Sequence, residues 1–438
     1  MKGTTMKLMI AAMLIVLTAA GASPQKKDYK TSMNNIAEQY VKLVLAIGQH
    51  DADYVDAYYG PPEWKDDVAK MNYQLTALKD MANALLRRVN RIRVPRYDKQ
   101  FQLRRTYLAK QLSAALTKIE MLSGKKYTFD DEAKKLYDAV PPKYSEKHFI
   151  TIINELKKVL PAGKGSVQER YEAFKKDFII PKEKLDTVFT SAITECRNRT
   201  KQFIALPENE RFTVEYVTDK AWSGYNWYKG DAHSVIQVNT DFPIYIDRAI
   251  DLAAHEGYPG HHVYNVLLES ELLKKKHWIE FCVYPLFSPQ SLIAEGSANY
   301  GIEVVFTKKE RMKFEKEVLF PLAGLDPGKV EQYYEVQDLI AQLGYAGNEA
   351  ARGYLNGKLT KKQAINWLVK YAMFEPKRAE QRIRFIEKYR AYVINYNLGQ
   401  DLVKKYVEKK AGKNPTAEKR WKVFTDLLSS PRMPGGLK

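Results

Sequence analysis

Apolar residues recur at steps of three and four along most of this 438-residue chain. One such stripe runs through Ile36, Tyr40, Leu43, Val44 and Ile47, and a similar one occupies residues 149–160. This spacing places apolar side chains on one face of an α-helix. Proline and glycine breaks separate the stripes, and no internal repeat is visible. We therefore predict a mostly α-helical fold of two closely packed lobes.

Residues 212–239 are the exception to the helical pattern. Val214, Tyr216, Val235, Ile236 and Val238 are β-formers, partly at alternating positions. They predict a small β-sheet with one strand over residues 234–239. Residues 239–243 then supply N-cap candidates and an early proline for the next helix. Two interpretations are open: the sheet is purely structural, or the free edge of this strand pairs with an extended peptide.

The N-terminus has the pattern of a signal peptide. Lys2 and Lys7 precede an apolar run over residues 8–20, which is short for a membrane span. Ala20 and Ala22 then form an A-x-A cleavage site. We predict a signal peptide over residues 1–22, export to the periplasm or cell exterior, and no later membrane span. An uncleaved signal anchor is the alternative.

The net charge of +18 allows two interpretations, a nucleic-acid binder or a lysine-rich surface. The lysines are spread in pairs and triplets over many predicted helices, with no nucleic-acid-binding module around them. We therefore favour a solvated surface and expect no nucleic-acid partner. The two cysteines, Cys196 and Cys282, are too few for a disulfide-rich scaffold. We favour two buried free thiols, and their pairing stays open.

Three of the seven histidines fall within residues 255–262, which read His-Glu-Gly-Tyr-Pro-Gly-His-His. Catalytic zinc is held by neutral imidazoles and a carboxylate, with one position left for water. In the usual H-E-x-x-H motif, the two histidines share a helix face and the glutamate is the general base for that water. The composition thus indicates a zinc-hydrolase site with Glu256 as the base.

The spacing is two residues longer than in that motif. In an unbroken helix, residues i and i+6 lie about 120° apart around the axis and roughly 9 Å apart along it, too far to share one ion. Pro259 cannot continue a regular helix, and Gly257 and Gly260 give the backbone freedom on either side. We predict a break that loops out two residues and returns His261 or His262 to the place of i+4. We prefer His261, because it follows the glycine at which the chain must rejoin the helix.

A third ligand is expected from a later helix. Glu295 is flanked by small residues that would permit close approach of a second helix. A glutamate on a solvated face is the alternative, but its position on the next substantial helix favours a ligand. We therefore assign zinc to His255, His261 and Glu295. Asp251, one turn before His255, is a candidate acceptor for an imidazole N–H, with a solvated acid as the alternative.

At these residues the chain resembles the bacterial DUF885 family, whose hallmark is HExxPGHH followed by an EGxA helix. That family is similar to the mostly helical gluzincin peptidases. Weaker resemblance extends to residues 58–62, 222–228 and 234–243, so it covers most of the chain after residue 22. The resemblance implies a mostly α-helical zinc metallopeptidase with its metal site within residues 255–303.

The C-terminal third departs from the family pattern. Many members carry a histidine before a T-x-x-Q-A element, but here Leu355 precedes Thr360 to Ala364, and residues 389–399 lack the family's P-G-Q. A transition-state donor from this region is therefore in doubt. The candidate replacements are Tyr354, Tyr392 and Tyr396.

The hypothesis from sequence is a single catalytic unit over residues 23–438 that cleaves peptides. Glu256 would activate a zinc-bound water and later protonate the leaving amine. One alternative is a catalytically inactive zinc scaffold that acts as a secreted binding protein; the missing histidine favours it and Glu256 disfavours it. Another is a zinc hydrolase that acts on a bond other than a peptide. Oligomeric state and cleavage preference stay open.

Overall fold

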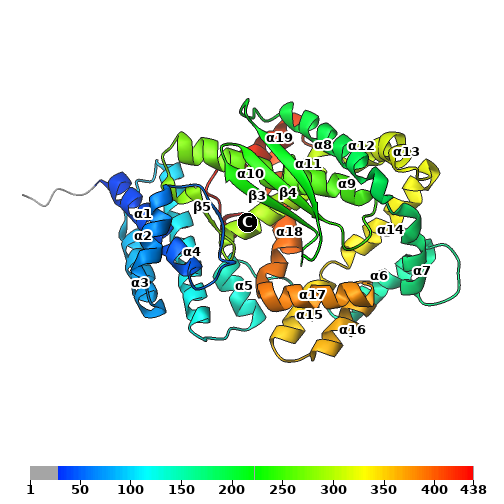
Figure 1. Cartoon of the computed structure of the whole chain (residues 1–438), viewed down its shortest axis with the longest axis horizontal. Helices are drawn as coiled ribbons and strands as arrows, with labels where there is room; N and C mark the ends of the chain where they lie inside the picture. The colour runs from blue at the N-terminus through cyan, green and yellow to red at the C-terminus, as the bar shows by residue number, and fades with distance from the viewer. Residues whose placement is uncertain (1–27, 221, 438) are drawn as a thin grey trace, which may run out of the picture.

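The computed structural model describes residues 28–220 and 222–437, and it is dominated by helices (Figure 1). The predicted signal peptide lies outside the described residues. The helices before the main sheet are α1 (Tyr29–Gly48), α2 (Pro62–Met71), α3 (Leu75–Arg91), α4 (Lys99–Leu122), α5 (Phe129–Tyr137), α6 (Glu146–Val159), α7 (Val167–Lys175) and α8 (Leu185–Lys201). Those after it are α9 (Asp247–Leu252), α10 (His261–Leu267), α11 (Pro289–Val305), α12 (Lys308–Phe314), α13 (Phe320–Ala323), α14 (Val330–Gln342), α15 (Ala346–Leu355), α16 (Lys361–Tyr371), α17 (Pro376–Tyr389), α18 (Ile394–Ala411) and α19 (Ala417–Leu428).

The strands form two small sheets. Strand β1 (Val55–Tyr58) pairs antiparallel with β5 (Val283–Pro285). The larger sheet contains β2 (Arg211–Val217), β3 (Gly224–Gly230) and β4 (His233–Asn239), in the order β2-β4-β3. Strand β4 runs parallel to β2 and antiparallel to β3. The predicted strand over residues 234–239 is therefore confirmed as β4.

Strand β4 has no free edge, so the expectation that this strand offers one to a peptide is wrong. It is the middle strand, because β2 and β3 occupy its two hydrogen-bonding sides. The edge strand β3 contacts the histidine segment, because the Asn226 side chain donates to the backbone carbonyl of Glu256. Periodicity predicts that a segment is a strand, but its place in the sheet depends on pairing partners.

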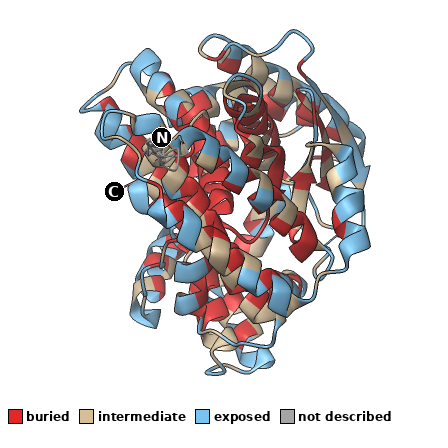
Figure 2. Ribbon diagram, turned by 90° about the vertical axis from the view of Figure 1, so that its left-hand side faces the viewer, coloured by how far each residue is buried: buried red, intermediate tan, exposed pale blue. Residues whose placement is uncertain are grey.

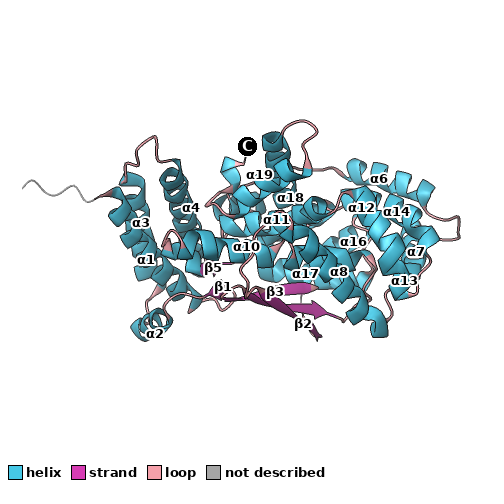
Figure 3. Ribbon diagram, turned by 90° about the horizontal axis from the view of Figure 1, so that it is seen from above, coloured by secondary structure: helices cyan, strands magenta, loops and turns pink. Residues whose placement is uncertain are grey.

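The helices gather at both ends of an elongated molecule, with α10, α11 and the sheet between them (Figures 1 and 3). Helices α1 to α4 lie at one end, and α6, α7 and α12 to α14 lie at the other. Buried residues follow the inner faces of the helices (Figure 2). The prediction of a mostly α-helical fold with a small sheet next to the histidine-bearing helix is confirmed.

One connected cluster of buried apolar side chains includes residues of α1, α11 and α19. The predicted stripe from Ile36 to Ile47 is buried in α1, at 0–2 % exposure for its five members. Cys196 and Cys282 are buried and unpaired. Within the described residues, no helix has the length and apolar character needed to cross a bilayer. The assignment of residues 23–438 to a single catalytic unit stays a prediction.

Helices α11 and α18 touch through their backbones. A Cβ built on Gly296 of α11 would lie 2.3 Å from the carbonyl carbon of Gly399 in α18. A Cβ on Gly399 would lie 2.8 Å from the carbonyl oxygen of Leu292. Side chains larger than hydrogen would therefore push the two helices apart. Tyr392, in the turn just before α18, contacts Glu295 beside this close crossing.

Candidate metal centre

The histidine segment breaks its helix as predicted. Helix α9 ends at Leu252, a π-helical turn follows over Ala253–Gly257, and α10 begins at His261. Across the break, the Gly260 N–H donates to the carbonyl of Ala254 at 2.8 Å, which spans six residues where an α-helix spans four. The two extra residues of the motif are taken up here, so His255 and His261 return to one side of the chain.

Gly260 is required by the close approach of the chain to itself. A Cβ at this position would lie 1.8 Å from the carbonyl oxygen of His255 and 2.4 Å from that of Ala254. Both obstacles are backbone atoms, so no rotation of a side chain can relieve the clash. Position 260 therefore requires glycine for its small size. The sequence predicts only backbone freedom at this position.

We expect Gly260→Ala to lower the free energy of unfolding by about 3 kcal/mol, because the added methyl must displace backbone. Urea denaturation of the purified protein would measure the change. Gly347→Ala in α15 is the matched control, since nothing beyond its chain neighbours and the adjacent backbone of its own helix lies within 4 Å of the place its added methyl would occupy. There the helix propensity of alanine should leave stability unchanged or raise it by up to about 1 kcal/mol. Equal stability of the two variants would contradict the tight packing at Gly260.

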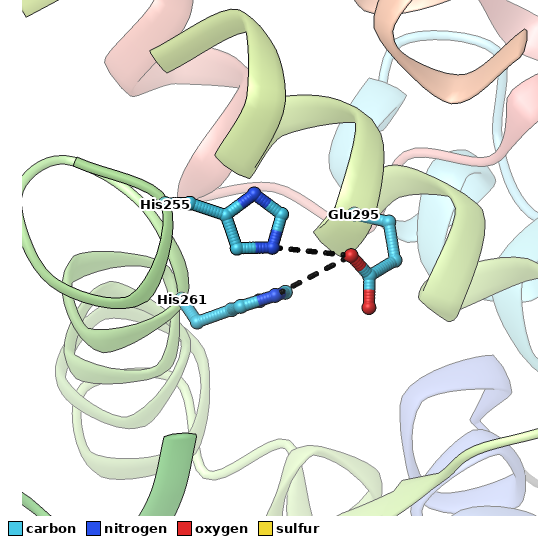
Figure 4. A group of neighbouring side chains, drawn as sticks. All are labelled: His255, His261 and Glu295. Carbon is cyan, nitrogen blue, oxygen red and sulfur yellow. Dashed lines mark ion pairs between the residues drawn. The ribbon is translucent and has the colours of Figure 1, made fainter. Parts of the chain in front are cut away.

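His255, His261 and Glu295 converge on one point (Figure 4). Their ligand atoms all lie within 4.8 Å of one another. The Oε2 atom of Glu295 is 3.3 Å from Nε2 of His255 and 3.6 Å from Nε2 of His261. Figure 4 shows both imidazoles pointing from the broken helix toward the carboxylate on α11. All three residues proposed as ligands from sequence are thus brought together.

These atoms fit a bound metal ion. Donors placed 2.0–2.2 Å from a tetrahedral ion stand about 3.3–3.6 Å apart, close to the two carboxylate-to-imidazole distances. Oε2 of Glu295 is buried and has no hydrogen-bond partner among the described residues. A buried carboxylate oxygen without a partner is costly, and a cation between the three side chains would satisfy it. Two imidazoles and one carboxylate suit a transition metal such as zinc.

Neighbouring side chains hold the three candidate ligands in place. Nδ1 of His255 lies 2.8 Å from Oδ1 of Asn299, which leaves Nε2 directed at the cluster. Asn299 in turn donates to the carbonyl of Tyr396 at 2.9 Å. The Tyr392 hydroxyl donates to Oε1 of Glu295 at 2.7 Å, so Oε2 faces the imidazoles. Such outer contacts orient the ligands of metal sites.

Asp251 does not serve as the imidazole acceptor considered from sequence. Its carboxylate pairs with Arg311 at 2.8 Å and with Arg248 at 3.3 Å. Asn299 takes that role for His255, as shown above. Asp251 is therefore part of an ion-pair network beside the site.

His262 is not part of the group that could hold a metal ion. Its Nδ1 lies 2.8 Å from the Ser234 hydroxyl, and its Nε2 lies 2.8 Å from Oε1 of Glu210. The side chain is fully buried. Arg197 also pairs with Glu210, at 2.8 Å. Both ring nitrogens of His262 are thus used in tying α10 to β4 and the segment before β2.

The charges of the clustered side chains shift one another's pKa values. Burial raises the pKa of Glu295, but the two imidazoles outweigh it and hold that pKa far below its usual range. Burial lowers the pKa of His261, but the nearby carboxylates, Glu295 foremost, raise it overall to about 9. Without a metal, the three side chains therefore attract a proton onto an imidazole, and a cation must displace it.

Glu256 faces a cavity of about 580 Å³ that the cluster also lines. Its carboxylate has no ion-pair or hydrogen-bond partner in residues 28–220 and 222–437, although its residue is only 5 % exposed. The side chain of Asn226 donates to the backbone carbonyl of Glu256 at 2.7 Å and fixes this segment against β3. Glu256 is thus a carboxylate held next to the cluster with its oxygens available.

Asp56 was not anticipated from sequence. It lies in β1 and lines the same cavity, where the Tyr225 hydroxyl donates to its carboxylate. Burial raises the pKa of Asp56 to about 7. The nearby His261 opposes this shift, whereas Glu295 and Glu256 add to it. The only sequence signal was the position of Asp56 just before residues 58–62, one of the segments that carry the family resemblance.

The three tyrosines proposed as donors have different surroundings. Tyr354 donates to Glu387 at the surface and does not line the cavity. Tyr392 and Tyr396 both line it. The hydroxyl of Tyr392 is used by Glu295, whereas that of Tyr396 has no hydrogen-bond partner among the described residues. Tyr396 is therefore the tyrosine whose hydroxyl is available to a bound molecule.

Comparison with protein families gives no match, and no curated protein sequence matches either. Among solved structures, a candidate lipoprotein from Colwellia psychrerythraea aligns with a TM-score of 0.48 and 16 % identity, over 84 % of this chain and 72 % of that one. A candidate lipoprotein of unknown function from Shewanella oneidensis aligns with a TM-score of 0.42 and 13 % identity, over 83 % of this chain and 76 % of that one. Both similarities are distant.

Proposed function

We propose that this chain is an exported zinc-dependent hydrolase that cleaves peptides, and that it belongs to the DUF885 family suggested by its HExxPGHH motif. The observation that carries the proposal is the position of Glu256. Its free carboxylate lines a cavity beside two imidazoles and a carboxylate that converge on one point. A site that only stored zinc would have no use for this additional acid. Export rests on the sequence of residues 1–22.

His255, His261 and Glu295 would hold the ion. Zinc in such a site lowers the pKa of a water molecule and polarises a carbonyl group. Glu256 would accept a proton from the attacking water as general base and return it to the leaving amine as general acid. The carboxylate must be accessible for the first transfer, which its position at the cavity allows.

The edge of β3 would align the substrate. The Asn239 N–H donates to the Ser223 carbonyl at 2.9 Å, and the antiparallel register continues with Tyr225 opposite Gln237. Hydrogen-bonded and non-hydrogen-bonded residue pairs alternate along an antiparallel ladder. The backbone N–H and C=O groups of Gly224 and Asn226 therefore face away from β4. Both residues line the cavity, so an extended peptide could add to this edge. Gly224 also has no side chain to fill the space beside Glu256: a Cβ there would lie 2.9 Å from its Oε1.

The purified protein is expected to contain about one zinc per chain, because two imidazoles, a carboxylate and water complete a catalytic site. Metal analysis should be combined with digestion of a peptide library before and after removal of metal by a chelator. Cleavage that stops with the chelator and returns with zinc supports the proposal. Stable zinc with no cleavage of any peptide would favour the inactive scaffold instead.

We expect Tyr396→Phe to lower kcat by roughly 10²-fold while zinc content is unchanged, if its hydroxyl stabilises the oxyanion of the transition state. The matched control is Tyr354→Phe, which removes a hydroxyl that bonds Glu387 outside the cavity. Steady-state kinetics of the two variants on one peptide would measure the difference. Equal rates for Tyr396→Phe and the wild type would remove Tyr396 from the mechanism.

A further inference from the structure

The cavity beside the metal centre also contains arginines. Arg248, Arg378 and Arg382 line it, the first on α9 and the other two one turn apart on α17. Arg248 pairs with Asp251 at 3.3 Å. Arg378 donates to the side-chain carbonyl of Gln381. Arg382 lies over the rings of Phe385 and Tyr396, with its guanidinium carbon 4.8 and 5.8 Å from their centroids.

Arg378 and Arg382 have no acidic partner of their own. Across residues 28–220 and 222–437, no carboxylate lies within ion-pair distance of either guanidinium, although both side chains are partly buried. Burial lowers the pKa of Arg378 to about 10, with Arg248 and Arg382 adding to the effect. Burial also lowers the pKa of Arg382. Positive charge is therefore concentrated here with no carboxylate in ion-pair contact, and Glu375 opposes the pKa shift of Arg378 only from a greater distance.

This positive region is connected to the metal centre through aromatic side chains. Tyr396, under Arg382, has its ring centroid 5.9 Å from that of Tyr392. Tyr392 in turn donates to the ligand Glu295 at 2.7 Å. One cavity thus has carboxylates and imidazoles at the metal centre and unpaired guanidinium groups a few side chains away.

A second, smaller cavity of about 210 Å³ adjoins the first at these arginines. Arg248, Arg378, Ser223 and Phe374 line both cavities. Its other walls include Phe242 and Met373, which offer apolar surface. Arg378 therefore lies where the two cavities meet.

We propose that Arg378 and Arg382 form a subsite for a carboxylate of the substrate, so that the enzyme prefers peptides with an anionic group near the cleaved bond. This inference rests on the proposed peptidase function and names its substrate class. Guanidinium groups bind carboxylates through paired, charge-assisted hydrogen bonds, and a partly buried site strengthens them. Peptides carry carboxylates in two places, at the C-terminus and on acidic side chains, and either can supply the group.

The test compares three peptide probes on the zinc-loaded wild type. They are tetra-alanine with a free C-terminus, its C-terminal amide, and an amidated tetrapeptide with one aspartate among alanines. We expect at least one carboxylate-bearing probe to exceed the neutral amide by roughly 10- to 100-fold in kcat/KM, the range for one or two charge-assisted hydrogen bonds. A preference for the free acid identifies the terminal carboxylate, and a preference for the aspartate peptide identifies the side chain. Equal cleavage of all three overturns the subsite.

The variant Arg378→Gln/Arg382→Gln should remove this preference, so that its kcat/KM for the anionic probe falls to its kcat/KM for the neutral amide. Arg384→Gln is the matched control, because Arg384 lies on the same helix but is exposed and outside the cavity. If the double variant does not fold, Arg382→Lys, which keeps the charge but loses the paired geometry, should show a partial loss. A preference that survives removal of both guanidinium groups would contradict the assignment.

Binding separates this inference from the proposed function. Calorimetric titration of the zinc-loaded Glu256→Gln protein with the free-acid, aspartate and amide probes measures carboxylate recognition without turnover. If no peptide is cleaved but a carboxylate-bearing probe binds tighter and Arg378→Gln/Arg382→Gln abolishes the difference, the subsite stands and the peptidase proposal fails. If peptides are cleaved but neither carboxylate-bearing probe binds tighter than the amide, the subsite fails and the peptidase proposal stands.

Discussion

Glu256→Gln protein is expected to lose peptide hydrolysis by roughly 10²-fold or more while it keeps its zinc and its fold. The amide has nearly the size of the carboxylate, but it cannot accept the proton of water. Glu256 is not one of the converging ligands, so its replacement should leave the metal in place. Its carboxylate makes no ion pair in the described part of the chain, so stability should change little. Single-turnover kinetics, metal analysis and thermal melting of the same preparation would measure the three properties.

The matched control is Glu303→Gln on α11. Its carboxylate pairs with Lys404 at 2.6 Å, outside the cavity. This change removes the same charge from the neighbourhood of the metal helix without touching the base. Near-normal turnover by zinc-loaded Glu256→Gln protein would rule out the mechanism. A comparable loss in the Glu303→Gln protein would show that overall charge, and not a base at position 256, limits the rate.

The break at residues 257–260 could be predicted because its causes are local. Pro259 removes one backbone donor and adds a clash, whatever surrounds it. For His255 and His261 to bind one ion, the chain then had to return to the same helix face after two extra residues. The clash at Gly260, with a Cβ position 1.8 Å from a backbone oxygen, could not be foreseen, because it depends on the path taken through the break.

The partners of the ligands were harder to predict, because they come from other elements. Asp251 is the acid one helical turn before His255, but Arg311 on α12 pairs with it. Asn299, which orients His255 instead, lies one turn after Glu295 on α11. Residues four apart share a helix face, so that spacing was a usable signal. Asp56 and Arg382 reach the cavity only through the packing of β1 and α17, which no local pattern reveals.

Replacing either His255 or Glu295 by alanine is expected to remove most of the bound zinc. Each supplies one of the three protein ligands, and two remaining ligands cannot hold a catalytic zinc tightly. Metal content after gel filtration in the presence of a weak chelator would measure the loss. Full zinc occupancy in both variants would contradict the ligand assignment and leave the cluster as an ion pair between imidazole and carboxylate.

The adjacent residues His261 and His262 offer the sharpest comparison, because the same substitution at neighbouring positions should have different effects. His261→Ala should lose zinc, since Nε2 of His261 faces Glu295 at 3.6 Å. His262→Ala should keep zinc but lower the free energy of unfolding by about 1–3 kcal/mol, because Ser234 and Glu210 lose a buried hydrogen-bond partner. Urea denaturation in a chelator separates this effect from the stability that bound metal adds. Zinc loss in His262→Ala with full zinc in His261→Ala would reverse the assignment of the second ligand.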